Sequence, residues 1–457
     1  MNPHDLLPAG LATAVETASG ARVVAVRPRG GGGASREGAE LDLLWPDGRA
    51  ASAYMNYDVH KAGAGDDAAF LREAAVLRAL SGPLAHAGVR VAPFYASIPD
   101  QRALVCGMIP GDDRFGSIAD PRQRDALAAD FMARLAALHR IDVVASPVED
   151  MGPVEPAETF IRGRLTDLRH GNSGRNWDPL IHLSLNWLAA NIPADMPAPV
   201  IVHGDAGPGN FLYNGDQITA LLDWELVHYG DPMADLAMLA IRMLFQGFVP
   251  LPQAFAAYEA AGGSKVDLRR LIYWRLLFQT GFARRSRYDD PDAPAPPNLG
   301  MNLVYSTIHR RVLSHALAEA AGIALPPVAL PDAPPGAHDK SFAIALDDIK
   351  DSIVPRLADQ QAAVKAKGMA RLIKWWRAIE RFAPGFHTVE KAEIEAALGR
   401  EFTDHAAAWS AFGDTVADDR IATGSAIILC NAHEAREAAL MADAMGGLAE
   451  TKFAPLD

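Results

Sequence analysis

The sequence predicts an α+β fold in which a β-rich N-terminal lobe is followed by a mainly helical lobe and then by an all-helical C-terminal module. Three observations predict it. Short β-rich runs separated by turns occupy residues 1–115, apolar residues recur at helical spacing from Pro121 onward, and only helical periodicity is found beyond residue 337. The length of 457 residues suits two to three domains, at roughly 100–200 residues for each.

The N-terminal lobe, residues 1–115, mixes strands with one helix. Its β-rich runs are residues 21–26, 39–45 and 103–108, and the turn Pro46-Asp47-Gly48 separates two of the strands. Asp66-Asp67 offers the start of the helix, and Ser81-Gly82 ends it. Between these positions apolar residues repeat every three to four residues, at Phe70, Leu71, Ala74, Leu77 and Leu80.

The helical lobe, residues 116–323, opens with a helix of about 20 residues, a typical helix length, in which Leu127, Phe131, Leu135 and Leu138 form one apolar face. A small β-rich island follows. It consists of three short apolar runs separated by polar turns, at residues 199–202, 210–213 and 218–222. The residues with the strongest chemical signal lie in this island.

The C-terminal module is set off by proline. Five of the ten residues 326–335 are prolines, so we interpret residues 324–337 as a linker. Residues 338–457 form the module, in which segments 342–379, 391–398 and 421–445 read as amphipathic helices. We expect this module to serve as a homo-oligomer or protein-partner interface, although core packing explains its apolar residues equally well.

Composition narrows the classes of function. The formal net charge of −13 repels nucleic acid backbones and anionic lipid, so neither is expected as a partner. No apolar stretch is long enough to cross a membrane. Cys106 and Cys430 cannot build a disulfide framework or a four-ligand zinc site unaided. These features predict a cytoplasmic protein with free thiols.

The segment His203-Gly204-Asp205-Ala206-Gly207-Pro208-Gly209-Asn210 is followed, after a short hairpin, by Leu222-Asp223-Trp224-Glu225. Phosphoryl transfer needs a carboxylate that accepts a hydroxyl proton and hard oxygen ligands that hold Mg²⁺. Asp205 fits the base, and Asn210 and Asp223 fit the metal. A plain polar turn would explain the Gly and Pro but not the spacing. A zinc hydrolase built on His203 and Asp205 lacks a third His or Cys ligand nearby.

These residues resemble the aminoglycoside phosphotransferase and choline kinase family, whose members have a two-lobed protein-kinase-like fold. The matching pattern, HGDxxxxN then DWE, GDP and DLA, runs from His203 to Ala237. The resemblance implies that Asp205 is the catalytic base, that Asn210 and Asp223 bind Mg²⁺, and that Asp235 braces the catalytic loop. Glu225 is left open between a metal contact and a structural acid. Asp231 and Asp235 also suit helix N-capping.

The N-terminal lobe adds nucleotide-binding candidates by the same resemblance. Gly31, Gly32, Gly33 and Ser35 would form the phosphate loop, and Cys106 and Met108 would lie on the interlobe hinge beside adenine. Glu73 looks like the helix acid that pairs with a strand cation, with an exposed surface acid as its alternative.

That strand cation is missing. Family members carry Lys or Arg on the strand before the helix, whereas this chain reads Ala53-Tyr54-Met55-Asn56-Tyr57. Either Lys61 or Arg36 is a candidate substitute. The loss weakens the stabilisation that positioned cations give to phosphoryl transfer.

The resemblance implies an ATP- and Mg²⁺-dependent kinase that phosphorylates a hydroxyl of a small molecule. The combination GGASRE, HGDAGPGNFL and DWE is similar to the subgroup associated with acyl-CoA dehydrogenases, which implies a hydroxy-acid or hydroxyacyl-CoA acceptor. An aminoglycoside kinase is the alternative among enzymes. A catalytically weak nucleotide-binding or scaffold protein is the alternative of another class, favoured by the missing strand cation.

Overall fold

The computed structural model describes residues 3–29, 36–58, 67–146, 148–283 and 296–456. The chain forms two compact units, each described here by itself. The first unit consists of Met1–Phe160, Asp195–Leu271 and Ala454–Asp457, and the second consists of Ile161–Ala194 and Ile272–Phe453.

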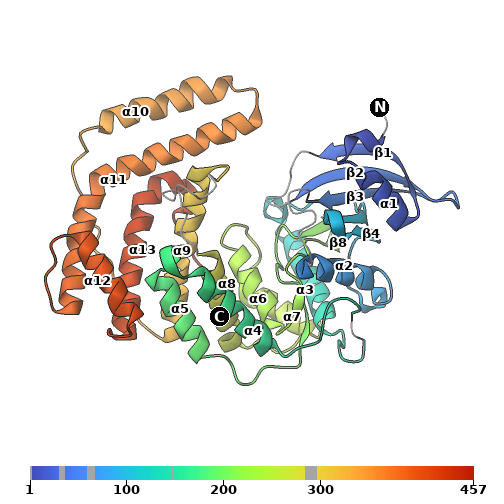
Figure 1. Cartoon of the computed structure of the whole chain (residues 1–457), viewed down its shortest axis with the longest axis horizontal. Helices are drawn as coiled ribbons and strands as arrows, with labels where there is room; N and C mark the ends of the chain where they lie inside the picture. The colour runs from blue at the N-terminus through green and yellow to red at the C-terminus, as the bar shows by residue number, and fades with distance from the viewer. Residues whose placement is uncertain (1–2, 30–35, 59–66, 147, 284–295, 457) are drawn as a thin grey trace. The chain divides into compact units, whose positions relative to one another are not determined.

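The first unit begins with a five-stranded antiparallel sheet (Figure 1). The strands, in their order across the sheet, are β1 (Arg22–Arg29), β2 (Glu37–Leu44), β3 (Ala50–Tyr57), β5 (Ala103–Gly107) and β4 (Phe94–Ile98). The three predicted β-rich runs are therefore confirmed as β1, β2 and β5.

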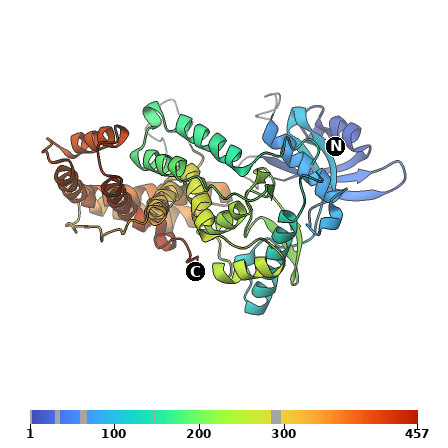
Figure 2. The same cartoon turned by 90° about the horizontal axis from the view of Figure 1, so that it is seen from below.

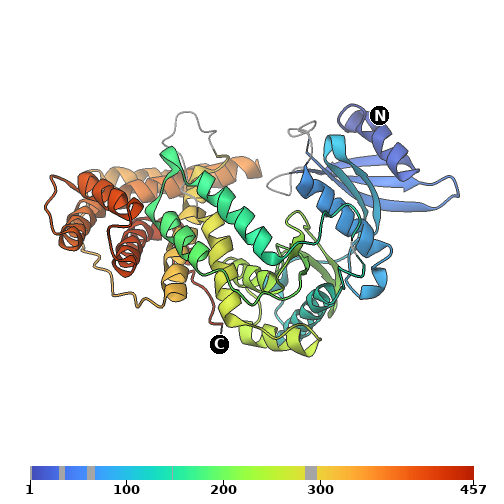
Figure 3. The same cartoon turned by 60° about the horizontal axis from the view of Figure 1, so that its bottom comes forward.

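The two faces of this sheet have different neighbours because side chains alternate along a strand. On one face Leu41, Ala53, Met55 and Val105 are buried in an apolar core with helix α1 (Leu11–Ser19). The sheet and its helices can be followed in blue in Figure 3. Tyr54, Asn56 and Cys106 fall on the opposite face, since Tyr54 is paired with Cys106 in the register. The opposite face therefore carries the polar positions.

Helix α2 (Ala68–Ser81) is the predicted helix of this lobe, and its start has a clear cause. The carboxylate of Asp67 accepts hydrogen bonds from the backbone N–H groups of Ala69 and Phe70, both at 3.2 Å, which satisfies two donors at the helix start. The buried side of α2 carries Phe70, Leu80 and also Glu73.

The helical part of the first unit supports two small sheets. It contains α3 (Pro121–His139), α6 (Met233–Arg242) and α7 (Leu251–Ala260), the sheet of β6 (Val200–Val202) with β9 (His228–Gly230), and the hairpin of β7 (Phe211–Asn214) with β8 (Gln217–Leu221). An aromatic cluster holds the hairpin against α3, because Phe211 packs on both Phe115 and Phe131 with ring centroids 5.9 and 4.9 Å apart. The predicted β-rich island is thus confirmed.

Among its described residues the second unit contains helices and no strands. In Figure 2 its helices can be followed by colour, from α5 in green to α13 in dark red. They are α4 (Ala157–Gly171), α5 (Pro179–Ala190), α8 (Leu268–Phe282), α9 (Leu299–Ala321), α10 (Asp339–Asp347), α11 (Gln360–Leu398), α12 (His405–Ala417) and α13 (Thr423–Met445).

Two of the predicted C-terminal helices have different limits. Residues 342–379 do not form one helix, because α10 ends at Asp347, a π-helical turn follows at Asp348–Ile353, and Asp359 caps a new helix, α11. Helix α11 then continues without a break through Pro384 to Leu398, so residues 379–391 are helical as well. Helix α12 was not predicted.

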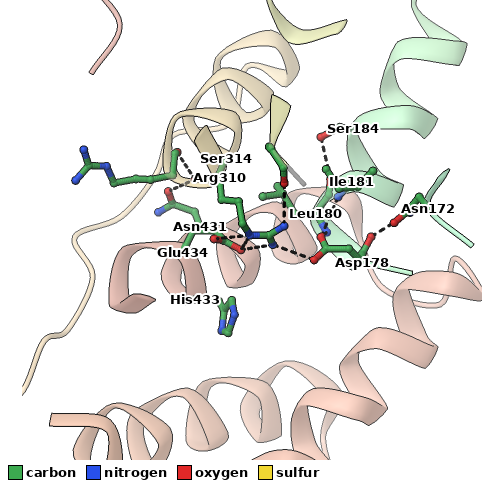
Figure 4. Close-up of polar contacts among 12 residues, drawn as sticks. Asn172, Asp178, Leu180, Ile181, Ser184, Arg310, Ser314, Asn431, His433 and Glu434 are labelled. Atoms are coloured by element: carbon green, nitrogen blue, oxygen red, sulfur yellow. Dashed lines mark hydrogen bonds and ion pairs between the residues drawn. The ribbon is translucent and has the colours of Figure 1, made fainter. Parts of the chain in front are cut away.

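A buried charge cluster ties three helices of the second unit together (Figure 4). Arg310 of α9 donates two hydrogen bonds, at 3.0 and 2.5 Å, to the carboxylate of Glu434 on α13, and pairs at 2.9 Å with Asp178, which caps α5. Beside them Ser314 donates to Asn431 at 3.1 Å. The segment predicted as a linker, residues 324–337, has neither helix nor strand, and it lies inside this unit.

Within the part of the chain that the structure describes, none of the helices is both long and apolar enough to span a lipid bilayer.

Candidate active site

The segment 203–210 forms a loop between β6 and β7, and a buried carboxylate holds its first turn. Asp235, at the start of α6, is completely buried and accepts hydrogen bonds from the backbone N–H groups of His203 and Gly204, both at 2.8 Å. Burial opposes its charge, but the hydrogen bond from His139 at 2.9 Å and these N–H groups keep its pKa below the ordinary value. Asp235 therefore braces the loop, as the resemblance implied.

Two glycines of this loop have a positive φ, and one of them also closely approaches the backbone of another segment. Gly204 has φ +86°, and a Cβ atom there would lie 2.2 Å from the carbonyl oxygen of Leu226. Gly209 has φ +89°, and its Cβ would lie 2.6 Å from Oε1 of Gln246. Other residues disfavour this backbone conformation, so the loop can follow its path only with glycine at these positions.

The loop brings the predicted base and one predicted metal ligand together. Asn210 Nδ2 donates to Asp205 Oδ2 at 2.7 Å and to the Asp205 carbonyl oxygen at 2.8 Å. This pair of hydrogen bonds fixes the Asp205 carboxylate relative to the Asn210 amide.

Asp223 follows β8 and stands in an acidic environment. Its φ of +63° is unusual for a residue other than glycine, although Asp tolerates this region better than most. Burial, together with the charges of Glu225, Asp205 and Glu73, raises the pKa of Asp223 to about 6. A cation would relieve this crowding of carboxylates, and Asn210 and Asp223 offer the hard oxygen atoms that Mg²⁺ prefers. The chemistry of these oxygen donors therefore fits magnesium, and the Oδ1 atom of Asn210 accepts a hydrogen bond from Arg242 at 3.1 Å in this structure.

Glu73 is not the surface acid that one interpretation suggested. Its residue is 3% exposed, and its Oε2 lies 2.7 Å from Nη2 of Arg36. Burial raises the pKa of Glu73, and the hydrogen bond from Arg36 acts against that rise. Of the two candidate substitutes for the missing strand cation, Arg36 is thus the one seen beside Glu73, while Lys61 lies outside the described residues.

Arg242 is a site residue that the sequence analysis missed. Its Nη1 donates to both carboxylate oxygens of Asp205 at 2.7 Å, its Nη2 to Asn210 Oδ1 at 3.1 Å, and its Nε to the Pro208 carbonyl at 3.0 Å. Seven residues separate Asp235 from Arg242, which places both on one face of α6. This spacing could have indicated Arg242 from the sequence, because Asp235 was already expected to brace the loop.

The remaining candidates are the residues expected to bind the nucleotide. Gly31, Gly32, Gly33 and Ser35 lie outside the described residues, so the structure does not describe the phosphate loop. Burial, and then the charge of Glu73, raises the pKa of the Cys106 thiol to about 12, as expected for a neutral thiol on the Glu73 side of the sheet. Met108 follows β5, is 43% exposed, and donates its N–H to the Ser52 carbonyl at 3.0 Å.

The five-stranded sheet followed by the helical lobe defines a protein-kinase-like fold. Residues 58–274 match the model of the phosphotransferase enzyme family, and this part of the chain belongs to that family.

One solved structure supports the fold, and a second is similar over a comparable part of the chain. A Ralstonia eutropha protein described as a candidate aminoglycoside phosphotransferase is 20% identical, with a TM-score of 0.50, over 65% of this chain and 93% of its own. A thermostable mutant of an aminoglycoside phosphotransferase, in complex with ADP and hygromycin B, is 15% identical, with a TM-score of 0.48, over 68% of this chain and 99% of its own.

Curated relatives are larger proteins. A probable acyl-CoA dehydrogenase of Arabidopsis thaliana is 28% identical over 166 residues, which are 34% of this chain and 20% of that protein. Acyl-CoA dehydrogenase family member 11 of Homo sapiens is 25% identical over 158 residues, again 34% of this chain and 20% of that protein. The matched part thus spans only a fifth of the length of these relatives.

Proposed function

We propose that this chain is a kinase that uses ATP and Mg²⁺ to phosphorylate a hydroxyl group of a small molecule. One observation carries the proposal: a braced loop holds Asp205 against Asn210, and the charge of Asp205 acts on the crowded carboxylate of Asp223. Proton acceptance and metal binding are the two tasks that phosphoryl transfer demands of a protein.

The roles follow from the geometry. Asp205, fixed by Asn210 and Arg242, would accept the proton of the acceptor hydroxyl as the new P–O bond forms. Asn210 and Asp223 would hold Mg²⁺, which neutralises charge on the nucleotide phosphates when it is bound. Asp235 would act only through the loop, by fixing the direction of its first N–H groups.

For the acceptor we propose a hydroxy-acid or hydroxyacyl-CoA compound. The support is the similarity to two proteins named as acyl-CoA dehydrogenases, which act on acyl-CoA thioesters by name. The similarity to a candidate aminoglycoside phosphotransferase supports the competing acceptor class. A panel of 3- and 4-hydroxy acids, their CoA thioesters and aminoglycosides, assayed by ADP release, separates the two.

The scaffold alternative loses its main argument, because Arg36 supplies a cation beside Glu73 even though the strand has none.

The first experiment measures the shift in melting temperature on adding ATP, with and without Mg²⁺. A ligand at about 100 times its Kd adds about 2.7 kcal/mol to the stability of the folded state. We expect a Mg²⁺-dependent shift in the wild type that Asp223→Ala abolishes and that Asp216→Ala, in the exposed turn of the β7–β8 hairpin, leaves intact. If ATP gives no shift with Mg²⁺ present, the proposed function is wrong.

A further inference from the structure

The sheet lacks a cation at the position where kinases of this fold need one, and strand alternation identifies that position. Ala53, Met55 and Tyr57 of β3 are buried in the core on one face, so Asn56 projects from the other face. Its carbonyl oxygen Oδ1 is buried and has no hydrogen-bond partner among the described residues. A neutral amide that is left unsatisfied occupies the place of a charged side chain.

The side chain of Arg36, directly before the neighbouring strand β2, supplies a cation on the same face. Gly38 of β2 pairs directly with Asn56 in the register, and Arg36 precedes Gly38 by two residues. Two residues are one period of a strand, so Arg36 continues the line of positions that face the same way as Gly38 and Asn56. Gly38 itself presents no side chain, and a Cβ there would lie 2.2 Å from the Tyr54 hydroxyl oxygen.

The guanidinium of Arg36 is held in a nearly buried ion pair. The side chains of Arg36 and Glu73 are 11% and 4% exposed, and the pair is closed by one hydrogen bond from Nη2 to Oε2 at 2.7 Å. Arginine has five N–H donors. Within the described residues this recorded bond uses Nη2 alone, which leaves Nε and Nη1 available for a further anion.

The charges of three carboxylates act on this guanidinium. Burial disfavours the charged form of Arg36, whereas Glu73, Glu225 and Asp223 favour it, and together they raise its pKa. A fixed cation between a helix glutamate and the carboxylates of a magnesium site lies where the phosphates of a bound nucleotide must pass.

We propose that Arg36, which directly precedes β2, takes the place of a cation on β3 and is the residue that binds the nucleotide phosphates in this enzyme, and that Glu73 orients it. This inference rests on the proposed kinase function. Arginine suits the task because its planar fork can bind one phosphate through two N–H groups, which a lysine cannot do.

The test removes the cation at Arg36 and places a lysine at Asn56 on β3 instead. Four proteins are compared with the wild type by titration calorimetry with Mg·ATP, Mg·ADP and adenosine: Arg36→Gln, Asn56→Lys, the double variant, and Arg122→Gln as a control that removes one exposed charge at the start of α3. Glutamine is chosen because its amide can still donate to Glu73, so the buried carboxylate keeps a partner. Melting curves verify that each variant is folded.

The expected pattern distinguishes phosphate binding from a structural role. Arg36→Gln should weaken Mg·ATP binding by about tenfold or more, as expected for losing hydrogen bonds to a charged group, while adenosine binding stays within about twofold. The double variant should regain at least about a third of the lost affinity on the logarithmic scale, because its lysine lies on the same face. Arg122→Gln should bind Mg·ATP like the wild type.

Three results would overturn the inference. A folded Arg36→Gln protein that binds Mg·ATP as tightly as the wild type removes Arg36 from the phosphate site. Equal losses of affinity for Mg·ATP and for adenosine indicate general disruption of the lobe. A double variant that binds Mg·ATP no more tightly than Arg36→Gln likewise contradicts the inference. Failure of the wild type itself to bind Mg·ATP would instead overturn the proposed function together with this inference, so the two failures are distinguishable.

Discussion

Replacing Arg242 by methionine tests whether this arginine is the main clamp on the catalytic loop. Methionine keeps an unbranched apolar stem but removes every N–H group, so the contacts to Asp205, Asn210 and Pro208 are lost together. The side chains of Arg242 and Asp205 are 19% and 20% exposed, which puts the pair between a surface ion pair and a buried one. Surface pairs contribute up to about 1 kcal/mol, whereas breaking a buried pair costs about 3–5 kcal/mol.

We therefore expect Arg242→Met to lower the free energy of unfolding by about 2 kcal/mol, which is intermediate between those limits. Urea denaturation measures this change, with Arg122→Met on the exposed side of α3 as the control, for which a change within about 0.5 kcal/mol is expected. A released loop also misplaces the base, so kcat for phosphoryl transfer should fall by about tenfold to a hundredfold.

Arg242→Lys refines the result, because lysine keeps the charge and loses the planar fork. It should fall between the wild type and Arg242→Met in both measurements. If Arg242→Met unfolds at the wild-type denaturant concentration and retains the wild-type kcat, the arginine contributes nothing to the loop and the reasoning is refuted.

Three further substitutions probe other contacts. Gly209→Ala places a Cβ 2.6 Å from Oε1 of Gln246 at a φ of +89°, so it should cost about 1–3 kcal/mol of unfolding free energy, which is refuted by an unchanged urea midpoint. Glu434→Gln removes a charge from the Arg310 cluster and should cost about 3 kcal/mol, whereas Glu437→Gln on the same helix should change stability by less than about 0.5 kcal/mol; equal effects would contradict the prediction. Burial disfavours the charged form of Glu390, but hydrogen bonds with His405 and His433 outweigh burial and hold the pKa of Glu390 below the ordinary 4.5. The charged carboxylate therefore stabilises the folded state above pH 4.5, and this stabilisation is lost as the pH falls further. Urea midpoints measured from pH 7 down to pH 3 should therefore fall less steeply for Glu390→Gln than for the wild type, and parallel curves would count against this prediction.

The sequence predicted the parts of the site that depend on local spacing. Asp205 and Asn210 are five residues apart in one loop, and the structure joins them by a direct hydrogen bond. The cap at Asp67 and the brace by Asp235 were likewise expected, since a cap is a contact within one turn and Asp235 belongs to a recognised pattern.

The rest depended on contacts between distant segments. The sequence left Glu73 open between two environments and left two cations as substitutes, because burial is decided by which helix face meets the sheet. Arg242 was missed because its seven-residue spacing from Asp235 indicates a shared helix face but not how far its side chain reaches along the loop 32 to 37 residues earlier. The C-terminal helix limits were misjudged for a local reason, as apolar periodicity continued across the cap at Asp359 and Pro384 was tolerated within α11.

The buried cluster around Arg310 limits how this chain can be shortened. Deleting the chain after the proline-rich segment would take away Glu434 and Asn431. Arg310 would keep Asp178 as its charged partner and the carbonyl oxygen of Ala283, and the face of α9 that packs on α13 would meet water. A shortened chain that keeps α9 but loses α13 would therefore need new residues on the exposed face of α9.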